Sequence, residues 1–127
     1  MSSIVTHIEN NKALTIHTLE GEISGADIIT TIEEYYYGEA TQDVIWDYSN
    51  AQLQNCKDES IKAIVKVANR YADRRPGGRS ALVLPSDLKF GLGRVYEALA
   101  EAANSVIVTK SFRSLQEARD WLEDPAV

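Results

Sequence analysis

The sequence lacks the features that mark several large classes of protein. One cysteine, Cys56, occurs in 127 residues, so an internal disulfide is excluded and a reducing compartment is indicated. No apolar run approaches the roughly 20 residues of a membrane-spanning helix, and the first residues lack the basic start and apolar stretch of a secretion signal. The net charge of -6 has the wrong sign for general contact with nucleic-acid phosphates. These absences predict a cytoplasmic protein with no membrane span and no nucleic-acid partner.

Patterns typical of enzymes and metal sites are also missing. His7 and His17 have no cysteine or carboxylate at the spacing of a metal site. Cys56 has no histidine near it in the sequence, although Lys57 beside it would lower the pKa of the thiol slightly. A Gly-x-Ser-x-Gly elbow and a phosphate-binding P-loop are absent. We therefore expect no metal, no cofactor and no enzymatic activity.

The sequence does contain the composition and patterning of an α/β domain. With 44% hydrophobic and 25% charged residues, residues 1–127 are expected to form a single domain with its own core. The run Ser80–Leu84 is largely apolar and too short for a helix, and it stops at Pro85, which cannot donate to a β-ladder. Such a run is typical of a strand that is buried on both faces, as in the middle of a parallel sheet.

Strand-like and helix-like segments alternate along the chain. Residues 4–8 and 13–19 are interpreted as a hairpin whose second strand ends at Gly21. Further strands are expected at 44–46, 80–84 and 106–108, and residues 48–57 are expected to form a polar loop. Helices are expected to follow the capping residues Ser24, Asp58, Ser86 and Ser114. The order β-β-α-β-α-β-α-β-α predicts an α/β fold whose sheet is mostly parallel, with one antiparallel N-terminal hairpin strand.

The third predicted helix contains two glycines in its interior. Its buried face is expected to consist of Leu88, Leu92, Val95, Leu99 and Ala103, which follow helical spacing. Gly91 and Gly93 each cost about 0.5–1 kcal/mol relative to alanine in such a position. Close packing against the sheet or against another subunit would explain them.

Two segments carry a resemblance to a known family: residues 79–101, RSALVLPSDLKFGLGRVYEALAE, and residues 112–122, FRSLQEARDWL. In these segments and in its order of elements, the chain resembles the SpoIIAA-like (STAS) family, in particular a small bacterial branch of undefined biochemistry. The resemblance implies a SpoIIAA-like fold. It also implies a non-enzymatic regulatory or protein-binding domain, similar to anti-sigma-factor antagonists, with a protein partner. A homodimer is the alternative form of association.

The same resemblance implies a phosphorylation site. In the antagonists of this family, a serine within an Asp-Ser-Ser-Gly pattern at the start of the second helix is phosphorylated. Asp58-Glu59-Ser60 has the corresponding position here and is followed by Ile61 instead of glycine, while Asp47-Tyr48-Ser49 resembles the family's pattern at the strand end. Ser60 or Ser49 is thus the implied phosphoacceptor, and a phosphorylation switch is an alternative function.

Polar residues follow the predicted strands at their carboxyl ends. After the last strand these residues are Thr109–Ser111. Ligands of open α/β sheets bind at this edge, where helix N-termini offer unpaired N–H groups to anions. We predict a binding edge formed by Asp47, Ser49, Ser86 and Asp87. In the alternative interpretation, these residues only cap helices and close turns.

A predicted partner surface consists of Tyr36, Lys89, Phe90 and Arg94. The adjacent tyrosines 35–37 cannot all face inward on a helix, so at least one is expected to be exposed. The arginines at 70, 74, 75 and 79 either recognise acidic groups of a partner or form a solvated face paired with acids such as Asp73. A further alternative is a carrier of a small apolar ligand, of the lipid-transfer type, although a lipid cavity would hollow the core of so short a chain.

Overall fold

The structure is a computed structural model that describes residues 2–9, 11 and 13–124. Its 5-stranded sheet has the strands in chain order, β1-β2-β3-β4-β5. The strands are β1 (Ser3–Glu9), β2 (Leu14–Glu22), β3 (Asp43–Gln52), β4 (Arg79–Val83) and β5 (Val108–Phe112). β1 is antiparallel to β2 and the remaining pairs are parallel, which confirms the predicted fold class. The hairpin connection includes residues 10 and 12, which lie outside the described residues.

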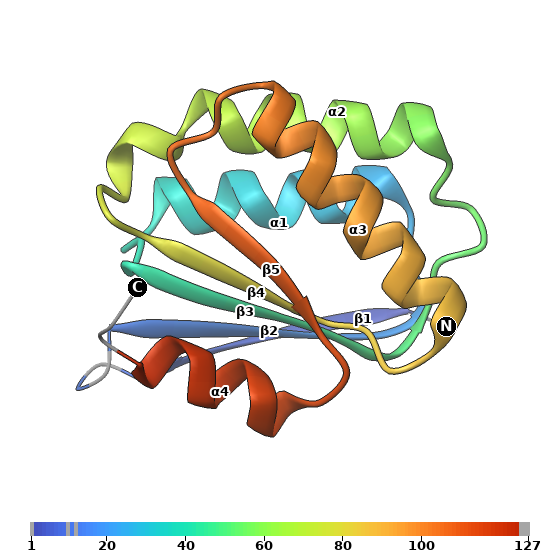
Figure 1. Cartoon of the computed structure of the whole chain (residues 1–127), viewed down its shortest axis with the longest axis horizontal. Coiled ribbons are helices and arrows are strands. Elements are labelled where there is room, and N and C mark those ends of the chain that lie inside the picture. Colours follow the sequence, from blue (N-terminus) through green and yellow to red (C-terminus); the bar gives the residue numbers. More distant parts are fainter. Residues whose placement is uncertain (1, 10, 12, 125–127) are drawn as a thin grey trace.

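The helices lie on both faces of this sheet. They are α1 (Gly25–Tyr37), α2 (Asp58–Arg70), α3 (Asp87–Ala102) and α4 (Leu115–Glu123), with a short 3₁₀ helix η2 (Ala72–Arg74) after α2. Figure 1 shows α1, α2 and α3 together on one face and α4 on the other. Each of the first three connects parallel strands that advance in one direction, and right-handed crossovers therefore place all three on the same side. α4 follows the last strand, so no crossover constrains it, and it covers the opposite face.

Local side-chain hydrogen bonds fix where most of the helices begin. Ser24 accepts a hydrogen bond from the Asp27 N–H, and the Asp27 carboxylate accepts one from the Ser24 N–H. Ser86 and Ser114 cap α3 and α4 in the same manner, each accepting from an N–H three residues on. The prediction for α2 was wrong, because its N-cap is Lys57, which makes no side-chain cap bond, and Asp58 is the first helical residue. Its carboxylate instead lies in the first turn, where the helix dipole favours negative charge.

The helices enclose an apolar core on each side of the sheet. The larger core lies under α1, α2 and α3 and includes Leu19, Ile23, Ile28, Ile32, Trp46, Ile64, Leu82 and Leu84. The smaller core lies under α4 and includes Leu14, Ile16, Ile45, Ala81, Val83 and Ala118. Residues Ser80–Leu84 are all buried, as predicted, and β4 pairs with β3 and β5 on its two sides.

β3 is longer than predicted, because it pairs with β2 as far as Gln52, and it contains a β-bulge. Thr18 pairs with Asp47 and Glu20 pairs with Asn50, so two residues of β3, Tyr48 and Ser49, oppose one residue of β2. The predicted polar loop 48–57 is thus strand up to Gln52. β2 likewise continues to Glu22, beyond the predicted end at Gly21.

The predicted position of the last strand and the predicted face of α3 were also wrong. The apolar residues at 106–108 precede most of β5, which runs from Val108 to Phe112. On α3, Leu88 is 76% exposed, whereas Gly93 and Ala100 are buried. A Cβ atom on Gly93 would collide with the side chains of Leu84 and Ser111. The glycine therefore lets α3 approach the sheet, and the buried face is rotated away from the predicted one.

Candidate functional site

The predicted binding edge is divided between two places in the structure. Asp47 and Ser49 lie within β3 instead of at its end, on either side of Tyr48 in the bulge. The Ser49 hydroxyl donates to Asp47 Oδ1 over 2.6 Å, and the Ser49 N–H donates to the same oxygen over 3.0 Å. The two side chains thus bind each other within the strand.

Ser86 and Asp87 lie at the start of α3, at the carboxyl edge of the sheet. Asp87 pairs with Arg113 at 2.8 Å. The same guanidinium donates to the Pro85 carbonyl over 3.1 Å and lies 4.2 Å from the centre of the Phe90 ring. These contacts tie the α3 N-terminus to the segment that leads into α4.

Lys89 connects the two halves of the predicted edge. Its ammonium donates to the Tyr48 and Ser49 carbonyls, each at 3.2 Å. Carbonyl groups in a bulge fall out of the regular ladder, and a lysine from the covering helix satisfies these two. The start of α3 therefore lies beside the bulge, with Lys89 as the link between them.

The predicted partner surface is only partly exposed. Tyr36 is 7% exposed and packs in the larger core, so its assignment to a surface was wrong; Tyr37 is the exposed tyrosine of the three, at 74%. Phe90 is half-buried beneath Arg113, and Lys89 is half-buried because it reaches the bulge. Arg94 is exposed and lies 3.8 Å from Glu97.

An apolar stripe lies on the outer side of α3. Leu88 and Val95, which were predicted to belong to the buried face, are both exposed, and a Cβ atom on Gly91, between them, would meet nothing within 4 Å. The three residues are spaced at i, i+3 and i+7 and therefore share one face. We call Leu88, Gly91 and Val95 the α3 stripe.

The two candidate phosphoacceptors differ in their surroundings. Ser60 is the third residue of α2 and is half-buried against the start of α1, where a Cβ atom on Gly25 would lie 2.9 Å from its Cβ. Ser49 faces the Asp47 carboxylate, to which its hydroxyl donates. A phosphate on Ser49 would thus lie against a negative charge, whereas one on Ser60 would lie at a helix N-terminus.

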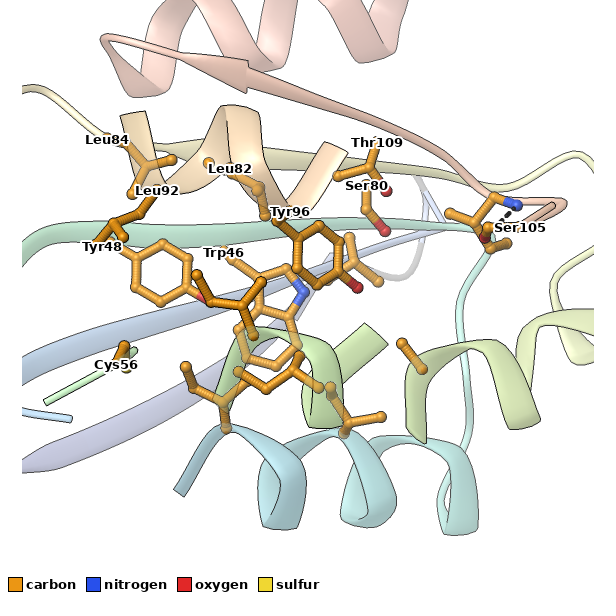
Figure 2. Close-up of a pocket in the computed structure, with 18 of the residues that line it drawn as sticks. Trp46, Tyr48, Cys56, Ser80, Leu82, Leu84, Leu92, Tyr96, Ser105 and Thr109 are labelled. Atoms are coloured by element: carbon orange, nitrogen blue, oxygen red, sulfur yellow. Dashed lines mark hydrogen bonds between the residues drawn. The ribbon is translucent and has the colours of Figure 1, made fainter. Parts of the chain in front are cut away.

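A cavity of about 100 Å³ lies between the sheet and the three helices of the same face. Figure 2 shows Trp46 and Tyr96 projecting into this space, with Leu84 and Leu92 toward one end and Ser80, Thr109 and Ser105 toward the other. Most of its wall is aliphatic or aromatic. The volume lies below the roughly 300–1,000 Å³ that is usual for ligand pockets, so it does not accommodate a lipid.

Arg75 contributes to the wall of this cavity and is 5% exposed. Its guanidinium donates to the Gln42 carbonyl at 2.9 and 3.0 Å, to the Arg79 carbonyl at 2.8 Å and to the Ser80 hydroxyl at 3.1 Å. The idea of a solvated arginine face was thus wrong for Arg75. It was also wrong for Arg79, whose guanidinium binds the carbonyls of the last turn of α4. No periodicity in the sequence distinguishes these two arginines from exposed ones.

Two tyrosine hydroxyls in the cavity wall have no hydrogen-bond partner within the described part of the chain. They belong to Tyr48, which is 8% exposed, and to Tyr96, which is half-buried. Burial raises the pKa of Tyr96 to about 12, and it raises the pKa of Tyr48 as well. Both side chains therefore stay neutral and can donate a hydrogen bond.

Cys56 lines the same cavity and is not an activated thiol. Its sulfur donates to the Ile23 carbonyl at 3.5 Å. Burial raises the pKa of this thiol, which overturns the expectation that Lys57 would lower it. Within residues 2–9, 11 and 13–124, no group of three or more His, Cys, Asp or Glu side chains is placed to hold a metal ion.

Comparison with solved structures places the fold among known ones. The anti-sigma factor antagonist SpoIIAA in its unphosphorylated form aligns with a TM-score of 0.53 and 16% identity, over 94% of this chain and 97% of that one. An uncharacterized DUF3478 protein from Shewanella loihica PV-4, described as SpoIIAA-like, aligns with a TM-score of 0.54 and 16% identity, over 95% and 93% of the two chains. The chain has a SpoIIAA-like fold.

The phosphorylated form of SpoIIAA, a Bacillus cell fate determinant, aligns with the same fold at a TM-score of 0.53 and 13% identity, over 95% of this chain and 100% of that one. No protein-family model and no curated protein sequence matches the chain. Within the described SpoIIAA-like fold, no helix is long and apolar enough to cross a membrane.

Proposed function

We propose that this protein is a non-enzymatic regulatory domain of the cytoplasm that acts by binding another protein, as the name anti-sigma factor antagonist indicates for SpoIIAA. The SpoIIAA-like fold supports this proposal at the level of architecture. The observation that carries it is the α3 stripe, because Leu88 and Val95 expose apolar side chains on one face of a helix, two turns apart. Exposed apolar patches bounded by polar residues mark interaction sites.

The partner that suits this surface is a different protein with basic groups around an apolar centre. The chain carries a net charge of -6, so two copies repel each other, whereas a basic partner is attracted. Glu101, near one end of the α3 stripe, is exposed and provides an acidic group at the rim of the contact. Asp87, at the other end, is exposed as well but is already paired with Arg113.

The test compares two variants that each place a charge on an exposed side chain. Leu88→Asp alters the α3 stripe, and Tyr37→Asp alters α1 at another large, strongly exposed side chain. A partner is captured with the wild-type protein, purified, and titrated against all three proteins. Leu88→Asp is expected to weaken binding by about tenfold or more, because it replaces a buried apolar contact by a charge, while Tyr37→Asp binds as the wild type does.

The result that contradicts the proposal is a partner that binds Leu88→Asp with unchanged affinity. Sedimentation of the purified protein tests the alternative of a homodimer. A wild-type dimer that Leu88→Asp converts to a monomer would mean that a second copy covers the α3 stripe, and it would overturn the choice of a different protein.

A second candidate function is control by phosphorylation of Ser60. The position of this serine in the first turn of α2 favours it, because α2 has no side-chain cap and its first N–H groups attract an anion. The crowding against Gly25 means that a phosphate at Ser60 also moves α1 relative to α2. Phosphorylation thus changes the surface formed by the starts of both helices.

Intact-mass analysis after incubation with kinases from the source cell tests this candidate. The wild-type protein and Ser49→Ala are expected to gain one phosphate, and Ser60→Ala is expected to gain none. Equal modification of Ser60→Ala and the wild type, or no modification of either, rejects the site.

A further inference from the structure

A groove of about 540 Å³ lies between α2 and α3, which are neighbours on the same face of the sheet (Figure 1). Its apolar lining consists of Val65 of α2 together with Leu99 and Ala103 of α3. The Asn69 amide donates to the Ala103 carbonyl over 3.2 Å, so a direct contact between the two helices holds the groove in shape. The volume lies in the range of roughly 300–1,000 Å³ that is usual for binding pockets.

Three cations line the same groove from α2. Lys62, Lys66 and Arg70 are all exposed, and their spacing of four residues places them in a row about 12 Å long. We call these three residues the α2 row. In the part of the chain that the structure describes, the side chains of the α2 row form no ion pair and no hydrogen bond. The groove thus presents unpaired positive charge on a chain whose net charge is -6.

Helix stability does not explain the α2 row. Like charges four residues apart destabilise a helix, and both Lys62 with Lys66 and Lys66 with Arg70 have this spacing. A glutamate in place of Lys66 would instead attract both neighbours. Only Arg70 lies in the last turn of α2, where the helix dipole favours a cation. The sequence therefore forgoes stability at this position, which is common where a surface serves binding.

We propose that the groove binds an amphipathic helix of another protein, with a row of carboxylates opposite the α2 row and apolar side chains against Val65 and Leu99. The sign of the charge follows from complementarity with the α2 row. Carboxylates four residues apart on the bound helix repeat the spacing of about 6 Å between successive cations. Because the walls of the groove are helices, they offer no strand edge to an extended segment, and a helix satisfies its own backbone.

The groove suits a protein segment better than a nucleic acid or an anionic membrane. Both of these carry negative charge over a large area, which the net charge of -6 repels. The inference goes beyond the proposed function, because it concerns α2 and an acidic ligand, whereas the α3 stripe suits a partner with basic groups. The two contacts use different residues, so either one can fail alone.

The test titrates the intact chain with a synthetic helical peptide that has leucines along one face and, beside them, three glutamates spaced by four residues. A second peptide with lysine in place of each glutamate keeps the apolar face and reverses the charge. NMR follows the backbone amides of both helices. The acidic peptide is expected to shift the signals of residues 62–70 and 99–103 and to bind at least about tenfold more tightly than the basic one. No binding, or equal affinity for the two peptides, overturns the proposal.

Lys66→Glu should weaken binding of the acidic peptide by about tenfold, because it turns attraction into repulsion. The same variant should raise the melting temperature by roughly a few degrees, since it pairs with Lys62 and Arg70. Lys57→Glu, an equal charge change at an exposed residue outside the groove, and Leu88→Asp, on the α3 stripe, should both keep the affinity within about twofold.

Three results would contradict this account of the groove. An equal loss of affinity in Lys66→Glu and Lys57→Glu would mean that net charge and not the α2 row attracts the peptide. A lower melting temperature of Lys66→Glu would assign the α2 row a role in stability. Binding of the wild-type chain to phosphatidylserine vesicles or to a DNA duplex, abolished by Lys66→Glu, would replace the acidic helix by one of these ligands.

Discussion

Protonation of His17 should destabilise the folded protein as the pH falls. The imidazole is 1% exposed, and its ring lies 4.3 Å from the Trp46 ring and 5.8 Å from the Tyr35 ring, measured between centroids. Nδ1 bonds the Thr6 hydroxyl at 2.9 Å, while Nε2 has no partner within the described residues. Burial, and after it the positive charge of Arg75, lower the pKa of His17 from 6.5 to about 4.

The direction and size of the effect follow from linkage. Above pH 6.5 the imidazole is neutral in the folded and unfolded states, so the stability that depends on a neutral His17 is fully present. Below pH 6.5 the unfolded chain binds a proton that the folded protein does not, and the free energy of unfolding falls by about 1.4 kcal/mol per pH unit until the folded pKa is reached. Between neutral pH and pH 5, His17 should therefore remove roughly 2 kcal/mol of stability.

Urea unfolding at several pH values measures this loss. The variant His17→Phe keeps an aromatic ring between Trp46 and Tyr35 and cannot be protonated, so its stability should decline less with falling pH than that of the wild type. His7→Gln is the control, because the side chain of His7 is 68% exposed. Parallel curves for the wild type and His17→Phe between neutral pH and pH 5 would refute the reasoning.

Two further predictions concern packing beneath α3. Gly93→Ala should lower the free energy of unfolding by about 1–3 kcal/mol, because the added methyl group meets Leu84 and Ser111; Gly91→Ala, in open space on the same helix, should raise it by about 0.5–1 kcal/mol. Calorimetry of Gly93→Ala and Gly91→Ala checks both predictions, and equal changes in the free energy of unfolding of the two variants would contradict the packing argument. Ser111→Ala should leave the melting temperature unchanged or raise it, since the Ser111 hydroxyl is buried without a partner in the described chain; a clear fall would show that the hydroxyl has a role in stability.

The order of elements and most helix starts were predictable because their signals are local. Ser24 and Asp27 form the expected reciprocal bonds within four residues, and Pro85 separates β4 from the cap of α3. The strand ends were less predictable because pairing between distant segments decides them. Asp47 stays in β3 because β2 and β4 both pair with it. Ser49 stays in β3 because β2 continues to pair with that strand as far as Gln52, and no local pattern reveals these neighbours.

The buried face of α3 and the polar end of the cavity were not predictable for a related reason. A pattern of large apolar residues assigned Leu88 to the core, while the actual contact uses Gly93, which has no side chain to give a signal. Arg75 was grouped with exposed arginines because charge normally indicates solvent. Its burial depends on the carbonyls of Gln42 and Arg79, which the fold brings to it.

The succession of the strands across the sheet has a consequence for synthesis. A nascent chain leaves the ribosome from its N-terminus, and here each new strand finds its neighbour already outside the exit tunnel. No strand has to be inserted between two that have already paired. In a partly synthesised chain, new strands are therefore added at one edge of the sheet only. The smaller core is the one that is completed by α4, the last helix to emerge.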